Sequence, residues 1–276
     1  MWNKPGTLVN TVEMQPTIDP GEPNHHATLI TDRELALARE IHRSLLPRDC
    51  NLPELEIAVR YREADRLGGD YATVQLKSNG DIFLAMCDAC GHGIASALLA
   101  ARVNSFVRDH AEQSRDLCDL AENLNRFIFE HFYLSGGSAA FLAAEIRPDR
   151  QEILFNSWAQ PPGLLYHSKT ATFERLGSRR PAMGMMQEFR QDCKIESVHY
   201  QPGDRLLFYT DGITEARNSA GEFFGIERLQ QFLRTTPVSL SSAEAAETIL
   251  VQVETFGGKE PCDDRLMIVV SFRGRD

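Results

Sequence analysis

The chain has 276 residues, of which 42% are hydrophobic and 25% are charged, and its formal net charge at pH 7 is −10. This length and apolar content are sufficient for one large domain with a buried core. The negative charge, and the lack of any long Lys/Arg run, argue against a protein that binds nucleic acid or docks electrostatically on anionic lipid. No apolar stretch approaches the roughly 18 residues of a membrane span, and the N-terminus lacks a signal-peptide core, so we expect a cytoplasmic protein without a membrane partner.

The cysteines do not have the pattern of a disulfide framework, because only six are spread over a long chain. Cys87 and Cys90 form a C-x-x-C pair, which is typical of redox or zinc sites, but no second pair follows. Since Cys87 ends an apolar run, we expect it to be a small buried residue.

The first part of the chain divides into a tail and a helix. Residues 1–30 have no hydrophobic periodicity and predict a flexible tail. Thr31 and Glu34 form a capping box that predicts a helix over 31–47, before a main domain over 48–276. The apolar positions of this helix recur at helical spacing: Leu37, Ile41 and Leu45. Such a narrow stripe is compatible with docking on the main domain and with a dimer seam.

The main domain reads as strands first, then paired helices and more strands. Apolar runs bounded by turn residues predict strands at 55–64, 71–76, 81–88, 140–146, 152–157, 163–167, 171–176, 194–200, 205–210 and 265–272. Helical spacing predicts helices near 94–111, 117–134, 225–234 and 242–256. The helix at 94–111 is apolar almost all round, which predicts burial on more than one side. Strands joined by short loops favour an α+β fold, with two packed antiparallel sheets flanked by helices.

Aspartates stand where strand-like runs meet loops. Asp88 follows one apolar run, Asp211 follows another, and Asp263 precedes the last. In antiparallel sheets the start of one strand lies beside the end of its neighbour, so we expect these carboxylates to converge. Carboxylates gathered at the rim of a core repel one another unless a cation neutralises them. Their oxygen ligands favour Mg²⁺, Mn²⁺ or Ca²⁺ over zinc or copper.

The loop after Asp88 has the composition of an anion-binding turn. Gly91 and Gly93 flank His92 immediately before a predicted helix. Glycine permits close approach of the backbone to a ligand, and the N-terminus of the helix offers unpaired N–H groups to an anion. Asp70 follows a glycine pair in a separate turn.

Taken together, these segments resemble the metal-dependent protein phosphatases of the PPM superfamily, in the bacterial branch that includes SpoIIE and the sigma-factor-regulating phosphatases. The matching stretches are AREIHRSLLP (38–47), GGDY (68–71), DACGHGIASALL (88–99), FYTDGITEARN (208–218) and DDRLMIVV (263–270). They follow the family's order over about 32–272. The resemblance implies an αββα sandwich with two Mn²⁺ or Mg²⁺ ions between the sheets at one end.

The resemblance also implies a role for each residue of the centre. Asp88 would bridge both metals, the backbone carbonyl of Ala89 would bind the second, and Asp211 and Asp263 would complete the first. Asp70 would act directly or through water. The chemistry implied is hydrolysis of a phosphomonoester by a metal-activated water.

Two roles stay open on the sequence alone. His92 is a candidate acid for the leaving alkoxide, since histidine side chains in general ionise near neutral pH, and the alternative is a packed, hydrogen-bonded histidine that holds the loop. The chain departs from the family pattern at positions where supporting polar groups are usual: Thr73, Ala140, Gln160 and Leu266. Loss of such groups can weaken metal binding, so a weak or conditional phosphatase is compatible with the pattern.

The function implied is that of a serine/threonine protein phosphatase acting on a phosphorylated anti-sigma-factor antagonist. The helix over 33–47 corresponds to the family's linker and would respond to a regulatory protein or to homodimerisation. The alternative is an inactive PPM-fold module that sequesters a signalling partner. A Ca²⁺-binding structural domain would need a 12-residue ligand loop, which the sequence lacks.

Overall fold

The computed structural model describes residues 32–177, 180–188 and 193–274. Residues 32–276 form one compact unit. The tail expected over 1–30 and the expected capping residue Thr31 lie outside the described residues. Within the described part of the chain, no helix is long and apolar enough to cross a membrane.

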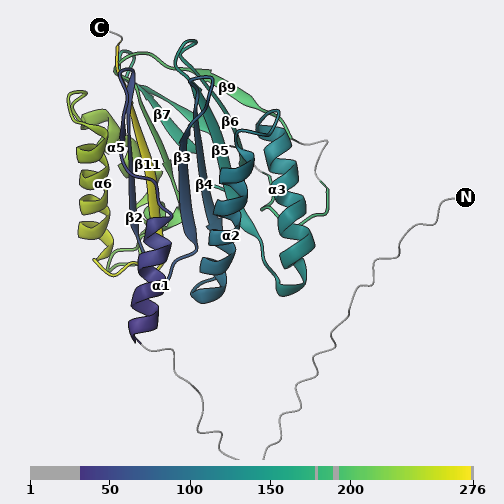
Figure 1. Ribbon diagram of the computed structural model, residues 1–276. Coiled ribbons are helices and arrows are strands. Elements are labelled where there is room, and N and C mark those ends of the chain that lie inside the picture. The colour runs from purple at the N-terminus through teal and green to yellow at the C-terminus, as the bar shows by residue number, and fades with distance from the viewer. Residues whose placement is uncertain (1–31, 178–179, 189–192, 275–276) are drawn as a thin grey trace, which may run out of the picture. The chain divides into compact units, whose positions relative to one another are not determined.

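Two antiparallel sheets form the centre of this unit (Figure 1). The six-stranded sheet has, in spatial order, β1 (Cys50–Asn51), β2 (Leu55–Arg62), β11 (Arg265–Phe272), β10 (Arg205–Tyr209), β7 (Gly163–His167) and β8 (Thr172–Leu176). The five-stranded sheet has the order β3 (Asp70–Leu76), β4 (Ile82–Ala89), β5 (Ala139–Arg147), β6 (Glu152–Trp158) and β9 (Glu196–His199).

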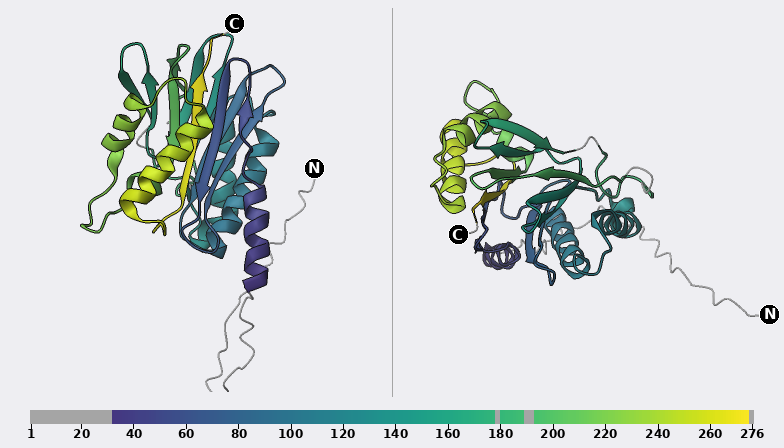
Figure 2. Two further views of the ribbon diagram at one scale, coloured as in Figure 1. Left: turned by 90° about the vertical axis from the view of Figure 1, so that its left-hand side faces the viewer. Right: turned by 90° about the horizontal axis from the view of Figure 1, so that it is seen from above.

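Helices cover the outer face of each sheet, as the view from above shows (Figure 2). The helices are α1 (Asp32–Ser44), α2 (Ile94–His110), α3 (Leu117–Phe132), the 3₁₀ turn η1 (Tyr133–Ser135), α4 (Asp211–Thr214), α5 (Gly225–Thr235) and α6 (Ser242–Gly257). Apolar side chains of α2 and α3 pack on the five-stranded sheet, and those of α5 and α6 pack on the six-stranded sheet. The predicted α+β fold of two flanked antiparallel sheets is confirmed.

A separate apolar cluster fills the space between the two sheets. Leu84 and Met86 of β4 meet Phe208 of β10 and Ile268 of β11 in this layer, and all four side chains are at most 1% exposed. Because side chains alternate along a strand, each sheet buries one face here and the other under its helices. The long apolar runs in the sequence arise from this burial on both faces.

The prediction that the helix at 94–111 is buried on more than one side is wrong. In α2, Ile94 is 43% exposed and Leu98 is 63% exposed. The buried residues include Leu99, Ala100 and Val103, which face the sheet. A helix on the outside of a sandwich contacts the sheet through one stripe, and its apolar residues on the flank stay accessible.

Helix α1 packs through a face other than its apolar stripe. Leu37 and Ile41 are each 57% exposed, whereas the neighbouring His42 is 5% exposed and lies 5.8 Å from the ring of Tyr61 on β2. The guanidinium of Arg43 donates two hydrogen bonds to the Glu63 carboxylate, at 2.6 and 2.9 Å. The stripe is therefore left open on the surface.

One disulfide, between Cys118 of α3 and Cys193 before β9, was not expected from the sequence. The partners are 75 residues apart, so their spacing carries no signal. Cys87 is buried, as expected, whereas Cys90 is exposed.

Candidate metal centre

The five-stranded sheet brings two of the expected aspartates together. Asp70 is the first residue of β3 and Asp88 is the last but one of β4. The two strands are antiparallel, and Asp70 is the cross-strand partner of Asp88. Both carboxylates therefore lie at the same end of this sheet.

The six-stranded sheet contributes the other two. Asp211 begins α4 just after β10, and Asp263 lies two residues before β11. Since Tyr209 pairs with Met267 in the antiparallel ladder, the chain leaving β10 passes the chain entering β11. A Cβ atom on Gly212 would lie 2.1 Å from the carbonyl oxygen of Asp264, so only glycine permits this approach.

Electrostatic coupling shows that the two pairs face each other. Burial, together with the charges of Asp211, Asp263 and Asp264, raises the pKa of Asp88 to about 7. Burial, followed by the charge of Asp88, raises the pKa of Asp70 well above its ordinary value. Four carboxylates from two sheets thus share one electrostatic environment.

The pKa values of the remaining pair are displaced in the same direction. Burial is the main cause for Asp211, with Glu215 adding to it. Burial also raises the pKa of Asp263, and the charges of Asp211 and Asp264 contribute. All four groups would be stabilised in their ionised form by a nearby cation, and destabilised without one.

The donor set fits a hard divalent cation. Asp70 Oδ2 and Asp211 Oδ1 are buried with no hydrogen-bond partner, so each offers an oxygen that burial leaves unsatisfied. Among the described residues, no three His, Cys, Asp or Glu side chains form a ready-made metal cluster. Carboxylate oxygens are the ligands that Mg²⁺ and Mn²⁺ prefer.

The backbone carbonyl of Ala89, an expected ligand, lies against the Gly-Gly turn. A Cβ atom on Gly69 would lie 2.9 Å from the Ala89 oxygen and 2.9 Å from Ser96 Cβ. The Ala89 N–H donates to the Gly69 carbonyl at 3.1 Å. The glycine at 69 therefore allows the end of β4 to approach this turn.

Asp264 has a supporting role that the sequence did not reveal. Its Oδ1 accepts the Ala64 N–H at 2.8 Å, and its Oδ2 accepts the Gly69 N–H at 2.7 Å and the Tyr61 hydroxyl at 3.2 Å. Asp264 is 8% exposed, while Asp263 is exposed. The two neighbours therefore differ: Asp264 anchors the turn before Asp70, whereas the exposed Asp263 acts on Asp88 through its charge.

The loop between β4 and α2 is open to solvent. Gly91 and Gly93 have φ of 100° and 75°, a region that favours glycine. His92 between them is exposed, which gives no support to the alternative of a packed histidine. Gly93 caps α2 without a side-chain hydrogen bond, so the first N–H groups of the helix stay available to an anion.

The departures from the family pattern have different consequences. Thr73 donates to Asn104 at 3.2 Å behind the centre. Leu266 packs in the core, and the Thr210 hydroxyl accepts its N–H at 3.0 Å and donates to the Asp264 carbonyl at 3.3 Å. Ala140 is the cross-strand partner of Asp88 and adds no polar group there.

Gln160 is the fourth position that departs from the family pattern, and its side chain is buried. It is 5% exposed, and neither side-chain amide atom has a hydrogen-bond partner among the residues that the structure describes. A buried amide without partners costs stability, because its lost hydration is not replaced. We have no physical account of why glutamine is retained there.

The fold defines the class of protein. The SiaA-PP2C domain of Pseudomonas aeruginosa superposes with a TM-score of 0.74 at 20% identity, covering 88% of this chain and 96% of that chain. The catalytic domain of the serine/threonine protein phosphatase PstP, solved with two manganese ions, superposes with a TM-score of 0.58 at 14% identity. That match covers 80% of this chain and 99% of PstP. The chain has the PP2C-like fold of the PPM phosphatases.

Sequence comparison identifies the family. Residues 78–273 match the profile described as Stage II sporulation protein E (SpoIIE), and the chain belongs to this family. It is 26% identical over 189 residues to the phosphoserine phosphatase RsbU of Bacillus subtilis strain 168, covering 68% of this chain and 55% of RsbU. It is 28% identical over 193 residues to the phosphoserine phosphatase RsbP of the same strain, covering 68% of this chain and 46% of RsbP. The chain thus spans about half the length of these relatives.

Proposed function

We propose that this protein is a Mn²⁺- or Mg²⁺-dependent phosphatase that hydrolyses phosphoserine or phosphothreonine on a protein. The observation that carries the proposal is the meeting of four carboxylates from two sheets, with the pKa of Asp88 raised to about 7. Such a cluster is costly unless a cation neutralises it. Homology to phosphoserine phosphatases supports the same reaction.

The carboxylates would hold two divalent cations. Asp88 would bridge them, Asp211 and Asp263 would bind one, and the Ala89 carbonyl would bind the other, with Asp70 acting directly or through water. Two cations bound there would lower the pKa of a water molecule and neutralise charge on the phosphoryl oxygens.

The surrounding loop would orient the phosphate. The free N–H groups at the start of α2 would donate to phosphoryl oxygens, because they lack a capping side chain. His92, exposed on the same loop, would donate its imidazolium proton to the leaving seryl oxygen. Cys90 takes no part in this scheme.

The test is metal-dependent release of phosphate. Purified protein is assayed with Mn²⁺ on para-nitrophenyl phosphate and on a phosphoserine peptide, with Asp88→Asn and Asp211→Asn as variants. We expect both variants to lose at least about 100-fold in kcat, since each removes a metal ligand. Asp109→Asn, on an exposed position of α2, is the matched control and should retain activity.

The alternative is an inactive PPM-fold module that binds a signalling partner. The buried amide of Gln160, which has no partner among the described residues, is the observation that favours it, because it stands where the family pattern has a supporting polar group. Wild-type protein that binds no Mn²⁺ at millimolar concentration in calorimetry, and releases no phosphate, would establish this alternative.

The proposed substrate is a phosphorylated anti-sigma-factor antagonist, on the strength of the family resemblance, and the proposed location is the cytoplasm. Control would come from a regulatory protein or from homodimerisation at α1. The exposed Leu37 and Ile41 of α1 support such an interaction, and Ile41 lines an open apolar pocket with the exposed Ile94 and Leu98 of α2. Protein lacking residues 1–47 that keeps its oligomeric state and activity would exclude this form of control.

A further inference from the structure

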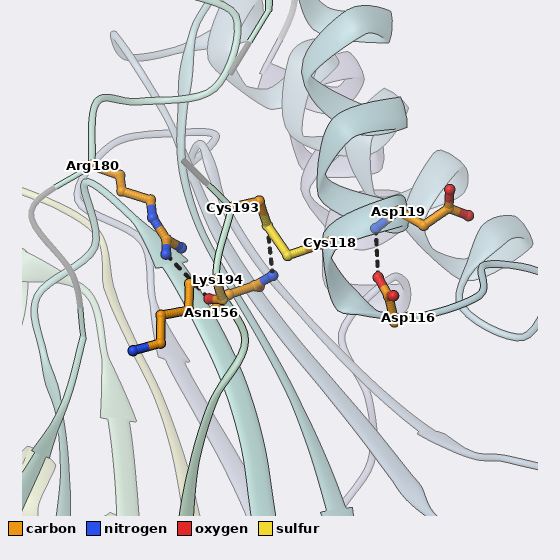
Figure 3. The surroundings of a disulfide bond; sticks show 7 residues. All are labelled: Asp116, Cys118, Asp119, Asn156, Arg180, Cys193 and Lys194. Carbon is orange, nitrogen blue, oxygen red and sulfur yellow. Dashed lines mark hydrogen bonds between the residues drawn. A yellow bond between two sulfur atoms is a disulfide. The ribbon is translucent and has the colours of Figure 1, made fainter. Parts of the chain in front are cut away.

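The disulfide between Cys118 and Cys193 joins two parts of the fold that are far apart in sequence (Figure 3). Cys118 lies in the first turn of α3, and Cys193 lies three residues before β9. Their Cα atoms are 5.7 Å apart. Both residues are half-buried, so a small thiol reagent can reach them.

The surroundings of Cys118 favour a thiolate when the bond opens. Cys118 is the second residue of a 16-residue helix, where the helix dipole and unpaired N–H groups stabilise negative charge. Two carboxylates share this turn, but both are engaged: Asp116 accepts the Asp119 N–H at 2.9 Å, and Asp119 accepts from Arg115 at 2.6 Å. A stabilised thiolate is also a better leaving group in thiol–disulfide exchange.

The surroundings of Cys193 also favour a thiolate when the bond opens. Asn156 Nδ2 lies 3.7 Å from Cys193 Sγ and donates to it. The next residue, Lys194, is exposed, and its carbonyl accepts from Arg180 at 3.1 Å. A donor to sulfur and neighbouring cations lower the free energy of a thiolate relative to the thiol.

The segment 180–188, which precedes Cys193, pairs with β5, the neighbour of the strand β4 that carries Asp88. Met183 exchanges two backbone hydrogen bonds with Ala139 on β5, at 2.8 and 3.1 Å. Ala139 is in turn the cross-strand partner of Ala89 on β4.

Asn125 of α3 fixes the same segment. Its Oδ1 accepts the Gly184 N–H at 2.8 Å, and its Nδ2 donates to the Met186 carbonyl at 2.9 Å. Asn125 and the disulfide therefore tie this part of the chain to one helix at two points.

We propose that Cys118 and Cys193 form a reversible redox-modification site, whose reagent is a low-molecular-weight disulfide such as glutathione disulfide. One cysteine thiolate attacks a sulfur of the reagent, forms a mixed disulfide and displaces one reagent thiolate. The second cysteine thiolate attacks the cysteine sulfur of the mixed disulfide and displaces the other reagent thiolate. Two electrons pass from the cysteine pair to the reagent, and the two cysteine protons end on the released thiols.

Closing the bond adds a covalent link to α3 close to the segment 180–188, which pairs with β5. When the bond opens, the segment keeps its hydrogen bonds to Asn125, Ala139 and Ala159. This inference is independent of the proposed phosphatase activity, because neither the exchange nor the local order requires a metal or a phosphate.

The first measurement is the redox state of the pair. Protein equilibrated at several ratios of glutathione to glutathione disulfide is quenched in acid, alkylated and digested for mass spectrometry. We expect the peptides with Cys118 and Cys193 to shift from joined to alkylated across these ratios. A bond that never forms, or one that stays closed in millimolar glutathione alone, overturns the proposal.

The second measurement is amide hydrogen exchange of the segment 180–188. Reduction should raise exchange there at least about threefold, because one of two tethers to α3 is removed. A Cys118→Ser/Cys193→Ser double variant should exchange at the faster rate in either redox state. Cys50→Ser, which removes an unpaired thiol in β1, is the matched control and should respond as wild type does.

If amide hydrogen exchange of the segment 180–188 does not change on reduction, the proposed link between the disulfide and the order of this segment is wrong. If the double variant fails to fold, wild-type protein held in reductant gives the same comparison.

Discussion

The substitution Asp264→Asn tests how the turn before Asp70 is held. Asp264 uses both carboxylate oxygens, since Oδ1 accepts from Ala64 and Oδ2 accepts from Gly69 and Tyr61. An asparagine amide has a single acceptor oxygen, so its NH₂ group must face one of these two backbone donors. The variant therefore loses at least one charge-assisted bond and leaves a buried N–H unpaired.

The expected cost follows from these contacts. A hydrogen bond to a charged group contributes about 1.5–3 kcal/mol, and an unsatisfied buried donor costs about 1–3 kcal/mol. Removing one negative charge from an acidic cluster offsets part of this loss, so we expect a net cost of about 2–3 kcal/mol. For a domain of this size that lowers the melting temperature by about 4–12 °C.

Asp263→Asn is the matched control, one residue away. Asp263 is exposed, and its Oδ1 accepts the Asp264 N–H at 2.8 Å, a bond that asparagine keeps. We expect unchanged or slightly higher stability of the metal-free protein, and Mn²⁺ affinity at least about 10-fold weaker in calorimetry. The reasoning is refuted if Asp264→Asn melts with wild type, or if Asp263→Asn is destabilised as much as Asp264→Asn.

Three further outcomes are expected. The pKa of Asp88 is about 7 in the folded protein and 3.8 in the reference state, so ionisation destabilises the metal-free fold as pH rises through this interval. The melting temperature of the metal-free protein should therefore fall between about pH 4 and pH 7. The fall should be smaller in Asp88→Asn, and an equal fall in that variant would contradict this cause. Gly69→Ala places a Cβ atom 2.9 Å from the Ala89 oxygen, which should destabilise the fold by about 1–3 kcal/mol and weaken Mn²⁺ binding. A variant with the stability and the Mn²⁺ affinity of wild type would exclude this packing constraint. Ile41→Glu, at a position 57% exposed, should change stability by less than about 0.5 kcal/mol and should dissociate any dimer formed through α1, as light scattering would detect.

The sequence predicts the strands well because most of them are buried on both faces or bounded by turn residues. The Asn79-Gly80 turn, for example, joins β3 to β4 as the hairpin signal indicates. The structure adds the two-residue β1 and the short α4, which are too brief to carry periodicity. Exposure on α2 was mispredicted, since periodicity cannot say how many neighbours a helix has.

For the site, the sequence singles out aspartates at strand ends, and the fold brings them to one end of the sandwich. It could not separate the roles of Asp263 and Asp264, because the partners of Asp264 lie about 200 positions earlier in the chain. The pairing of Cys118 with Cys193 was equally hidden, since two cysteines at ordinary spacing carry no sign of their partner.

The proposed ligands are divided between the layers of the sandwich: Asp70 and Asp88 belong to one sheet, and Asp211 and Asp263 to the other. A slide of one sheet past the other by one residue, about 3.3 Å, would carry a whole pair away from a shared ion. Catalytic activity would then depend on how the two sheets are positioned relative to each other. Helix α1 packs on the six-stranded sheet through His42 and Tyr61 of β2, and its Ala38 and Ile41 line a pocket with Ile94 and Leu98 of α2, which lies on the other sheet.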